Sequence, residues 1–330
     1  MRAVVVDEPG GIDRLVLRDV AEPSPAAGEV VVEVAYAGVN WGDLQKRLGI
    51  YPEPVAYPAV LGLEVSGRVA AVGPNVRGFA LGDRVAAITG PRMLGGYAER
   101  CVVPATYAMQ LPAAIDLKAG AALPAASLTA WHLINTASAP AAGDTILIHA
   151  IGGAVGLMLT QFGRRSGLDV LGTVGTAAKA ARPLALGARA VIDRSRSDFV
   201  AEVMRLTEGV GVDLVIDSLG ADYLERSFDC LRPFGRIINI GEAGGYPDFD
   251  IRAKLYERST SLAGFEFLHA VPGSPVWERS VTDIVAAFAC REVELPVEAV
   301  YPLDRAGLAH ERLASRQVSG KLLLEVNATL

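Results

Sequence analysis

The chain has few cysteines and no concentration of positive charge. Its 330 residues include three cysteines, Cys101, Cys230 and Cys290, with no Cys-x-x-Cys pair. Neither a disulfide framework nor a cysteine-rich zinc site is expected, so we interpret all three as small buried apolar groups. The 31 Lys and Arg are scattered among 37 Asp and Glu, which gives a net charge of −6. This balance argues against a nucleic-acid partner.

Long apolar runs are also missing. No stretch reaches the length of a membrane span without Gly, Pro or a charge, and the chain opens directly into the strand-like segment MRAVVV. We therefore expect a cytoplasmic protein with no membrane partner. At 51% hydrophobic residues, the chain is long enough for two domains with separate cores.

The most informative segment is TILIHAIGGAVG, residues 145–156, in which a strand-like run passes through small residues into an apolar helical stretch. At the amino end of a helix, such residues let backbone N–H groups approach a pyrophosphate, which the helix dipole also favours. The residues assigned to this contact are Ala150, Gly152, Gly153, Ala154, Val155 and Gly156. The motif lacks the first glycine of the dinucleotide fingerprint, so tight packing alone is the alternative reading.

The residues that follow favour the dinucleotide reading. Apolar, strand-like runs recur at 170–174, 190–193, 213–218, 235–241 and 261–267, and segments of helical spacing such as 198–209 and 221–235 separate them. Strands that alternate with helices in this way predict a doubly wound parallel sheet, with helices covering both faces.

The end of the second strand indicates which dinucleotide is bound. An NAD site usually carries Asp or Glu there, whereas this strand ends Gly172-Thr173-Val174-Gly175-Thr176. Thr176, Lys179 and Arg194 can donate hydrogen bonds to a 2′-phosphate, which a carboxylate would repel. NADPH is therefore the expected cofactor. The alternative is that Lys179 and Arg194 are ordinary solvated charges.

The first 120 or so residues have a different pattern of apolar residues and turns. Short alternating runs at 29–40, 63–73, 82–88 and 97–103 are separated by Gly-rich turns, which predicts antiparallel strands in a barrel-like domain. The last strand, 321–326, needs a sheet to join, and we assign it to this domain. The predicted organisation is a catalytic domain made of residues 1–122 and 269–330, with a dinucleotide domain, 123–268, inserted in it.

A series of short motifs gives the chain a family resemblance over nearly its whole length. They are AGVNWGD (37–43), GIYP (49–52), GLEVSG (62–67), GDRV (82–85), GGYAE (95–99), LTA (128–130) and SGK (319–321). In this order and spacing, the chain resembles the zinc-independent medium-chain dehydrogenases/reductases, close to NADPH:quinone oxidoreductases and 2-enoyl thioester reductases. The resemblance implies an α/β fold with a GroES-like β-barrel catalytic domain and an inserted Rossmann sheet. It also implies a homodimer, for which the strand at 261–267 is the suspected contact.

Differences from the zinc-dependent branch are equally informative. Zinc alcohol dehydrogenases carry a cysteine where this chain has Asn40 and a histidine where it has Leu63. Too few ligands remain for a tetrahedral site, so no catalytic zinc is expected. The four histidines are dispersed, and His149 is interpreted as a satisfied core or turn residue.

The resemblance also assigns roles to single residues. Tyr51 corresponds to the tyrosine thought to protonate the α-carbon in enoyl thioester reductases; alternatively it stacks on substrate or closes its loop. Asn40 would orient the nicotinamide carboxamide or the acceptor oxygen. Asp43 either lies near the nicotinamide or caps a helix beginning DLQKRLG. Further residues expected along the cofactor site are Thr129, Ser218, Gly241, Arg316 and Lys321.

Without zinc, an unactivated ketone loses several kcal/mol of transition-state stabilisation, whereas a quinone or enone spreads charge onto a conjugated oxygen. We therefore expect an NADPH-dependent oxidoreductase that transfers hydride to quinones or similar conjugated carbonyl acceptors, without metal or flavin. One alternative is a reductase of 2-enoyl-CoA or acyl-carrier thioesters. Another is an NADPH-binding structural or regulatory protein without turnover.

Overall fold

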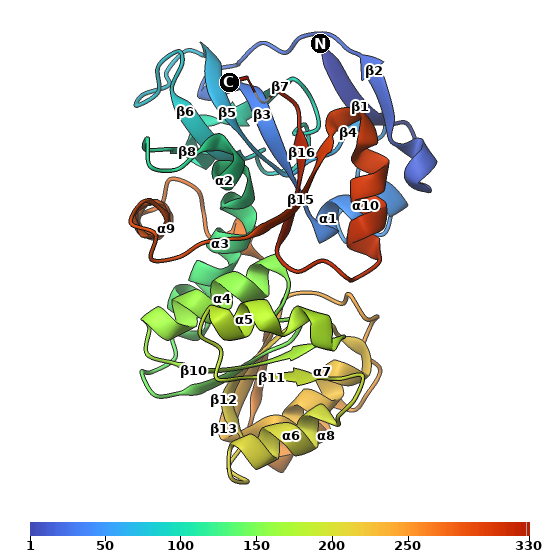
Figure 1. Cartoon of the computed structure of the whole chain (residues 1–330), viewed down its shortest axis with the longest axis vertical. Coiled ribbons are helices and arrows are strands. Elements are labelled where there is room, and N and C mark those ends of the chain that lie inside the picture. Colours follow the sequence, from blue (N-terminus) through green and yellow to red (C-terminus); the bar gives the residue numbers. More distant parts are fainter. Residues whose placement is uncertain (328) are drawn as a thin grey trace. The chain divides into compact units, whose positions relative to one another are not determined.

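The computed structural model describes residues 1–327 and 329–330, apart from the side chain of residue 268. Within this range the chain divides into two compact units. The first joins residues 1–126 with residues 270–330, and the second consists of residues 127–269. A middle segment, green to orange in Figure 1, therefore interrupts a unit that is formed by both ends of the chain.

The first unit contains two sheets. The larger has seven strands in the order β15-β16-β3-β5-β6-β8, with β7 paired to the first half of β3; the smaller has the order β2-β1-β4. The strands are β1 (Arg2–Val6), β2 (Val16–Asp19), β3 (Glu29–Val39), β4 (Ala59–Val60), β5 (Glu64–Val72), β6 (Arg84–Ile88), β7 (Arg100–Pro104), β8 (Ala108–Gln110), β15 (Val297–Pro302) and β16 (Lys321–Glu325). Buried side chains of both sheets form one hydrophobic core.

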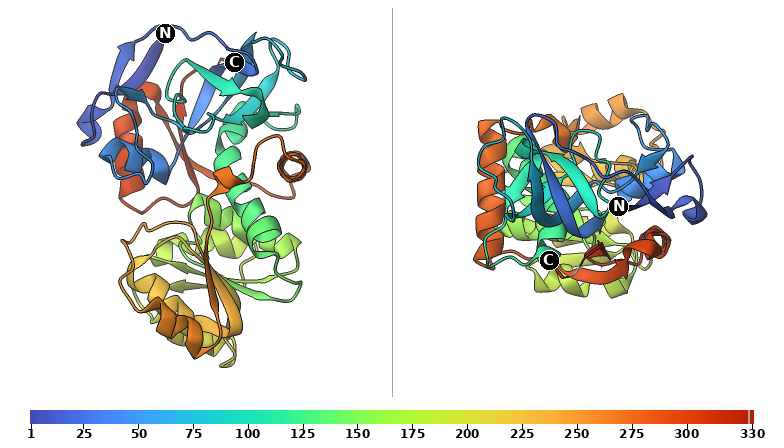
Figure 2. Two further views of the ribbon diagram at one scale, coloured as in Figure 1. Left: turned by 180° about the vertical axis from the view of Figure 1, so that it is seen from behind. Right: turned by 90° about the horizontal axis from the view of Figure 1, so that it is seen from above.

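The last strand completes the larger sheet. β16 pairs antiparallel with β3, with Leu322 opposite Val39, and parallel with β15. In Figures 1 and 2 the red β16 accordingly lies beside the blue β3. The predicted pairing of the last strand with the amino-terminal strands is confirmed.

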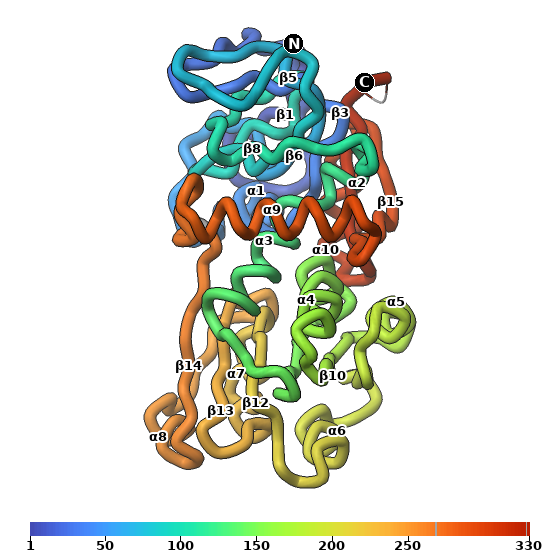
Figure 3. The backbone as a smooth tube through the Cα atoms, turned by 90° about the vertical axis from the view of Figure 1, so that its left-hand side faces the viewer, coloured from blue at the N-terminus to red at the C-terminus, as the bar shows by residue number. Residues whose placement is uncertain are grey.

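Helices of the first unit are α1 (Trp41–Leu48), α2 (Leu117–Ala122), α9 (Pro275–Ala289) and α10 (Ala306–Ala314). α3 (Pro124–His132) runs across the division between the units. Figure 3 shows α9 lying across one side of the first unit. Residues of α9, of β8 and of the loop at 75–79 line a cavity of about 720 Å³. In the described part of the chain, no helix has both the length and the apolar character that a membrane span needs.

The second unit is built on a six-stranded parallel sheet with the order β11-β10-β9-β12-β13-β14. Its strands are β9 (Thr145–Ile148), β10 (Asp169–Val174), β11 (Ala190–Asp193), β12 (Val212–Asp217), β13 (Leu231–Asn239) and β14 (Ser261–Gly264). Its helices are α4 (Ala154–Arg165), α5 (Ala181–Ala185), α6 (Phe199–Leu206), α7 (Ala221–Ser227) and α8 (Ile251–Glu257). The predicted fold class, an antiparallel domain with an inserted doubly wound parallel sheet, is confirmed.

Helices cover both faces of this sheet, as its nearly continuous apolar strands require. On one face, Leu147 and Leu171 lie in register and pack in a core with Phe199 of α6 and Leu224 of α7. On the other face α4 packs so closely that a Cβ at Gly163 would lie 3.2 Å from the Val170 side chain. In Figure 1, α4 and α5 are seen together on that second side.

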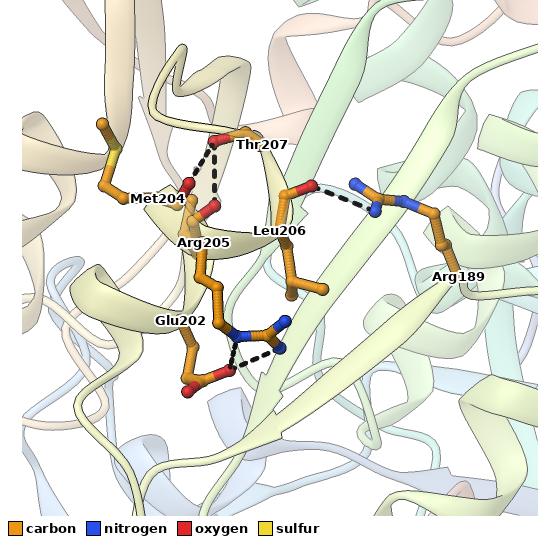
Figure 4. A network of polar contacts seen from close by, with 7 residues as sticks. Arg189, Glu202, Met204, Arg205, Leu206 and Thr207 are labelled. Carbon is orange, nitrogen blue, oxygen red and sulfur yellow. Dashed lines mark hydrogen bonds and ion pairs between the residues drawn. The ribbon is translucent and has the colours of Figure 1, made fainter.

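Side chains also close the carboxyl end of α6 (Figure 4). The Arg189 guanidinium donates to the Leu206 carbonyl oxygen at 3.2 Å, and the Thr207 hydroxyl donates to the carbonyl oxygens of Val203 at 2.8 Å and Met204 at 3.4 Å. The last carbonyls of a helix have no partner within the helix, so these donors satisfy them. The Arg189 bond also joins the helix to the start of β11.

Three local predictions are wrong. The helix expected over 221–235 ends at Ser227, because the chain turns through residues 228–230 and Leu231 then pairs with Val212 of β12. The strand expected over 261–267 ends at Gly264. Cys290 is exposed, because it follows the last residue of α9, whereas Cys101 and Cys230 are buried as expected.

Candidate active site

The glycine-rich turn in the second unit connects β9 to α4. Ala150 adopts a left-handed conformation with φ of 52°, and the Gly153 N–H closes the turn on the Ala150 carbonyl oxygen at 2.9 Å. Gly153 is the N-cap, so the helix begins at Ala154 and continues through Val155 and Gly156. The first N–H groups of a helix have no partner within it, and they are available here to an anion.

Two glycines of this turn allow close approach of other backbone segments. A Cβ at Gly156 would lie 2.6 Å from the Cα of Ile151, so only glycine lets the first turn of α4 fold back on the strand-to-helix turn. A Cβ at Gly152 would lie 3.1 Å from the carbonyl oxygen of Lys179 and 3.2 Å from its Cε. Lys179 therefore lies directly against the glycine turn.

The loop after β10 brings most of the predicted phosphate ligands together. Gly175 is exposed and Thr176 half-buried, and a Cβ at Gly175 would lie 3.8 Å from Nη2 of Arg194. Arg194 follows β11 and donates its backbone N–H to the Val174 carbonyl oxygen at 3.0 Å. Thr173 differs from the others, because its side chain is fully buried and its hydroxyl accepts a hydrogen bond from the Arg194 guanidinium.

Two polar atoms at this place, the buried Thr176 Oγ1 and Arg194 Nε, have no hydrogen-bond partner in the part of the chain that the structure describes. Burial lowers the pKa of the Arg194 guanidinium, and Tyr223, Asp193 and Asp217 compensate only in part. A buried donor and a half-buried cation of this kind fit an anionic group such as a 2′-phosphate. The residues present therefore fit NADPH.

Ser218 and Gly241 follow the carboxyl ends of β12 and β13. The Ser218 carbonyl oxygen accepts the Ala243 N–H at 3.1 Å, so the two loops are tied together at the same edge of the sheet. Beneath them the buried Asp217 carboxylate accepts backbone N–H groups and the Asn239 side chain, and burial raises its pKa. Thr129, the other expected residue of this unit, lies on α3 and is half-buried.

In the first unit a buried ion pair supports Asn40. The Lys321 ammonium pairs with the Glu64 carboxylate and donates to Asn40 Oδ1 at 2.6 Å, while Asn40 Nδ2 donates to Glu64 Oε1 at 2.8 Å. The second Glu64 oxygen accepts the Ala125 N–H at 2.7 Å. Lys321 is 2% exposed and Glu64 0%, so this pair is held in the protein interior. The amide group of Asn40 consequently has a defined orientation.

Asp43 supports the same residue from its backbone side. Its carboxylate accepts the Asn40 N–H at 2.9 Å and the Gly62 N–H at 3.1 Å. The helix begins at Trp41 with Asn40 as its N-cap, so the predicted start at Asp43 is wrong, but Asp43 does cap the helix, because its carboxylate closes a capping box on the Asn40 N–H. Burial raises the pKa of Asp43 to about 6, although the Lys46 ammonium and the Asn40 N–H both favour the ionised form.

Tyr51 lies in the loop that follows α1 and is half-buried. The Lys46 ammonium lies 4.6 Å from the centre of its ring and donates to the carbonyl oxygens of Arg92 at 2.8 Å and Met93 at 2.9 Å. A Cβ at Gly42 would lie 3.4 Å from the Tyr51 ring, so the ring lies against the first turn of α1. Arg316 is elsewhere in this unit, exposed, with its guanidinium 5.7 Å from the Trp41 ring centre.

The residues do not form a metal site. Among the described residues, no group of three or more His, Cys, Asp or Glu side chains is arranged to hold a metal ion. Leu63 is buried and apolar, and the Asn40 side chain is engaged with Glu64 and Lys321. Where a zinc enzyme would place ligands, this chain has a hydrogen-bonded amide and an ammonium–carboxylate pair.

Sequence reasoning missed several residues that shape these sites. Glu64 is not predicted as a site residue, because the sequence shows it only as part of a motif. The available signal is that a buried carboxylate needs a cation, which a lysine in the last strand can provide. Lys46 has no sequence signal, because its burial depends on the carbonyls of a distant loop. The interpretation of His149 as a core residue is confirmed, since it is 2% exposed and both its ring nitrogens are hydrogen-bonded, but no pattern in the sequence identifies its partners.

Comparison with known proteins agrees with this arrangement. Residues 26–113 match the model of the alcohol dehydrogenase GroES-like domain, and residues 154–285 match that of the zinc-binding dehydrogenases. The chain is 34% identical to a probable quinone oxidoreductase of Schizosaccharomyces pombe, over 98% of this chain and 95% of that protein. The chain belongs to the zinc-independent medium-chain dehydrogenases/reductases.

Two further members of this family are similar over their whole length. A 2-haloacrylate reductase from a Burkholderia species is 32% identical, with 98% of each chain covered. The crystal structure of Escherichia coli quinone oxidoreductase complexed with NADPH superimposes with a TM-score of 0.92 at 30% identity, covering 99% of this chain and 100% of that one. The match therefore includes both units.

Removal of the Lys321 charge is expected to destabilise the first unit. In Lys321→Met the Glu64 carboxylate stays buried without its cation, which costs about 3–5 kcal/mol of unfolding free energy. The double variant Lys321→Met/Glu64→Gln should recover most of this loss in denaturant unfolding. Arg2→Met, which breaks the exposed pair with Glu99, serves as control and should cost far less, because water already screens that pair. Equal losses for both single variants would contradict the interpretation.

Asp43 is expected to make stability depend on pH. Its folded pKa of about 6 is above the ordinary 3.8, so the folded state binds the proton more tightly. The free energy of unfolding should therefore fall by about 3 kcal/mol as pH rises from about 4 to about 6. Asp43→Asn should remove this part of the slope, measured by urea unfolding across that range, whereas Asp19→Asn at an exposed position should not. An unchanged slope in Asp43→Asn would contradict the assignment.

Proposed function

We propose that this protein is an NADPH-dependent oxidoreductase that reduces quinones or similar conjugated carbonyl compounds. The observation that carries the proposal is the edge of the second unit at which Lys179 lies against Gly152 of the glycine turn, while the buried Thr176 Oγ1 and Arg194 Nε have no hydrogen-bond partner among the described residues. The relatives support it, since quinone oxidoreductases match along the whole chain and one is complexed with NADPH.

In this proposal the second unit holds NADPH, which supplies a hydride when bound. The amino end of α4, with Ala154, Val155 and Gly156, binds the pyrophosphate, because its free N–H groups and the helix dipole favour negative charge. Gly175, Thr176, Lys179 and Arg194 bind the 2′-phosphate. Ser218 and Gly241 line the site at the adjoining strand ends.

The first unit is proposed to bind the acceptor. Asn40 Oδ1 accepts from Lys321 and one Nδ2 hydrogen goes to Glu64, so a single N–H remains for an acceptor oxygen or a carboxamide. Tyr51 is proposed as the proton donor, because the Lys46 ammonium near its ring stabilises the negative charge left on the oxygen. Three further residues are proposed to contact the cofactor or to support its contacts: Thr129, Arg316 and Lys321. Lys321 would act indirectly, through its hydrogen bond to Asn40.

The chemistry balances without a metal. Hydride adds to one end of the conjugated system, the electron pair moves onto the carbonyl oxygen, and one proton completes the reduction. Hydrogen-bond donors are enough for such acceptors, because conjugation already spreads the charge. The 2-haloacrylate reductase relative favours, as a second candidate, reduction of a carbon–carbon double bond conjugated with a carboxyl group, and enoyl thioesters belong to that same chemical class.

We also propose a cytoplasmic homodimer. All three cysteines are free, as is usual in a reducing compartment. Among the described residues, β14 pairs only with β13, and we propose that its other edge meets a second copy of the chain, because an unprotected edge strand tends to find a partner.

Replacement of the two phosphate-binding cations tests the cofactor site. Lys179→Met/Arg194→Met should raise the Kd of NADPH about 100-fold or more and that of NADH less than about threefold, because only NADPH carries the 2′-phosphate. Binding is measured by fluorescence titration of the full chain. Arg182→Met, a nearby cation outside the proposed site, is the control. Equal losses for NADPH and NADH would contradict the assignment.

Tyr51→Phe separates the two acceptor classes. NADPH oxidation is measured with 1,4-benzoquinone, 2-chloroacrylate, crotonyl-CoA and cyclohexanone. Reduction of the two carbon–carbon double bonds should fall about 10²-fold or more when the proton donor is lost, while benzoquinone, which takes its proton from water, should change little. Tyr57→Phe is the matched control, since that hydroxyl donates to the Lys46 carbonyl oxygen. Cyclohexanone, which has no conjugation, should not be reduced. Inactivity of the unaltered protein with the other three compounds, despite NADPH binding, would refute the proposed function.

A further inference from the structure

A chain of buried hydrogen bonds begins at Arg194 and runs into the core of the second unit. The Arg194 guanidinium donates to the Thr173 hydroxyl, and Thr173 Oγ1 lies 2.8 Å from His149 Nδ1. The other ring nitrogen of His149 lies 2.8 Å from Ser227 Oγ, which donates to the Tyr223 carbonyl oxygen at 2.6 Å. The side chains of Thr173 and Ser227 are fully buried. Each of these hydrogen bonds joins two protein groups directly.

The order of donors and acceptors in this series of hydrogen bonds is fixed. A hydroxyl has one hydrogen, so Thr173, which accepts from Arg194, donates that hydrogen to His149 Nδ1. The proton of the neutral imidazole is then on Nε2, which donates to Ser227. Burial, together with the Arg194 charge, lowers the pKa of His149 to about 3, so the ring stays neutral at physiological pH. Each group therefore has a single role, and none can turn without breaking a neighbour's bond.

Aromatic packing holds the same groups from the side. The Arg194 guanidinium lies 4.9 Å from the centre of the Tyr223 ring, and the His149 ring meets Phe199 edge-on at 5.1 Å. Tyr223 thus contacts the guanidinium with its ring, while its carbonyl oxygen ends the hydrogen-bond chain. A long, flexible arginine side chain is fixed at both its terminal nitrogen and its planar face.

We propose that His149, Thr173 and Ser227 are positioning residues for cofactor selectivity, which hold the Arg194 guanidinium in place for the 2′-phosphate before the cofactor arrives. The proposal rests on the assignment of Arg194 to that phosphate. Fixing the side chain in advance lowers the entropy lost on binding, so the gain applies only to a ligand that carries the phosphate. The orphaned Arg194 Nε fits this view, since one donor of the fixed group remains for a ligand.

The test compares two substitutions at one position in the full-length protein. Thr173→Val keeps the shape but removes the hydroxyl that links Arg194 to His149, whereas Thr173→Ser keeps the hydroxyl. Kd values are measured for NADPH and NADH, and for adenosine 2′,5′-bisphosphate against 5′-AMP. Thr173→Val should weaken both phosphate-bearing ligands about tenfold and the other two less than about twofold. Thr173→Ser should retain most of the discrimination.

A second arm of the test separates positioning from general loss of stability. Ser227→Ala breaks the series of hydrogen bonds at the end far from Arg194. It should weaken the binding of the two phosphate-bearing ligands by about threefold, a smaller effect than that of Thr173→Val. Val203→Ala, a core change in α6 outside the hydrogen-bond chain, should lower the melting temperature without altering the NADPH-to-NADH ratio. In an Arg194→Met background, Thr173→Val should no longer change that ratio, because the group being positioned is gone.

The outcomes distinguish this inference from the function on which it rests. If Arg194→Met leaves the NADPH-to-NADH ratio unchanged, the phosphate assignment itself is wrong. If Arg194→Met lowers the ratio but neither Thr173→Val nor Ser227→Ala does, the positioning role is overturned and the cofactor site stands. The positioning role is also overturned if Thr173→Val weakens the binding of all four ligands equally. The same holds if Thr173→Val still changes the NADPH-to-NADH ratio in the Arg194→Met background.

Discussion

The buried pair between Glu64 and Lys321 is the interaction on which the first unit depends. It joins the start of β5 to the start of β16, and through Asn40 it also includes the start of α1. Two charges in the interior are tolerated only when they are paired and hydrogen-bonded. The orientation of the Asn40 amide therefore follows from the same contact that holds the last strand in its sheet.

In the second unit, polar side chains act in a comparable way. The glycine turn needs no side chain, since its chemistry comes from backbone N–H groups and from the space that Gly152 and Gly156 leave. The neighbouring phosphate site is different, because Arg194 depends on Thr173 and on the aromatic ring of Tyr223. One half of the cofactor site is thus built from backbone, and the other half from side chains that need support.

The sequence predicts the fold well where the pattern is local. Apolar strands alternating with helical segments gave the parallel sheet, and carboxyl ends of neighbouring strands meet at one edge, which brings Thr176 and Arg194 together. It fails where contacts distant in sequence decide. The helical pattern after Ala221 continues past Ser227, yet pairing of Leu231 with Val212 turns the chain into a strand. Lys321 and Asn40 are 281 positions apart, and no local pattern links them.

The place of β16 in its sheet has a consequence for the order in which the chain acquires structure during synthesis. All six strands of the second unit have been made by residue 264, so its sheet can close while later residues are still being added. In the first unit, the second half of β3 has β5 on one side, but its other side lacks a partner until residues 321–325 emerge. Domains tend to fold as units during synthesis. The nucleotide-binding half would then be complete before the half that surrounds it in the sequence.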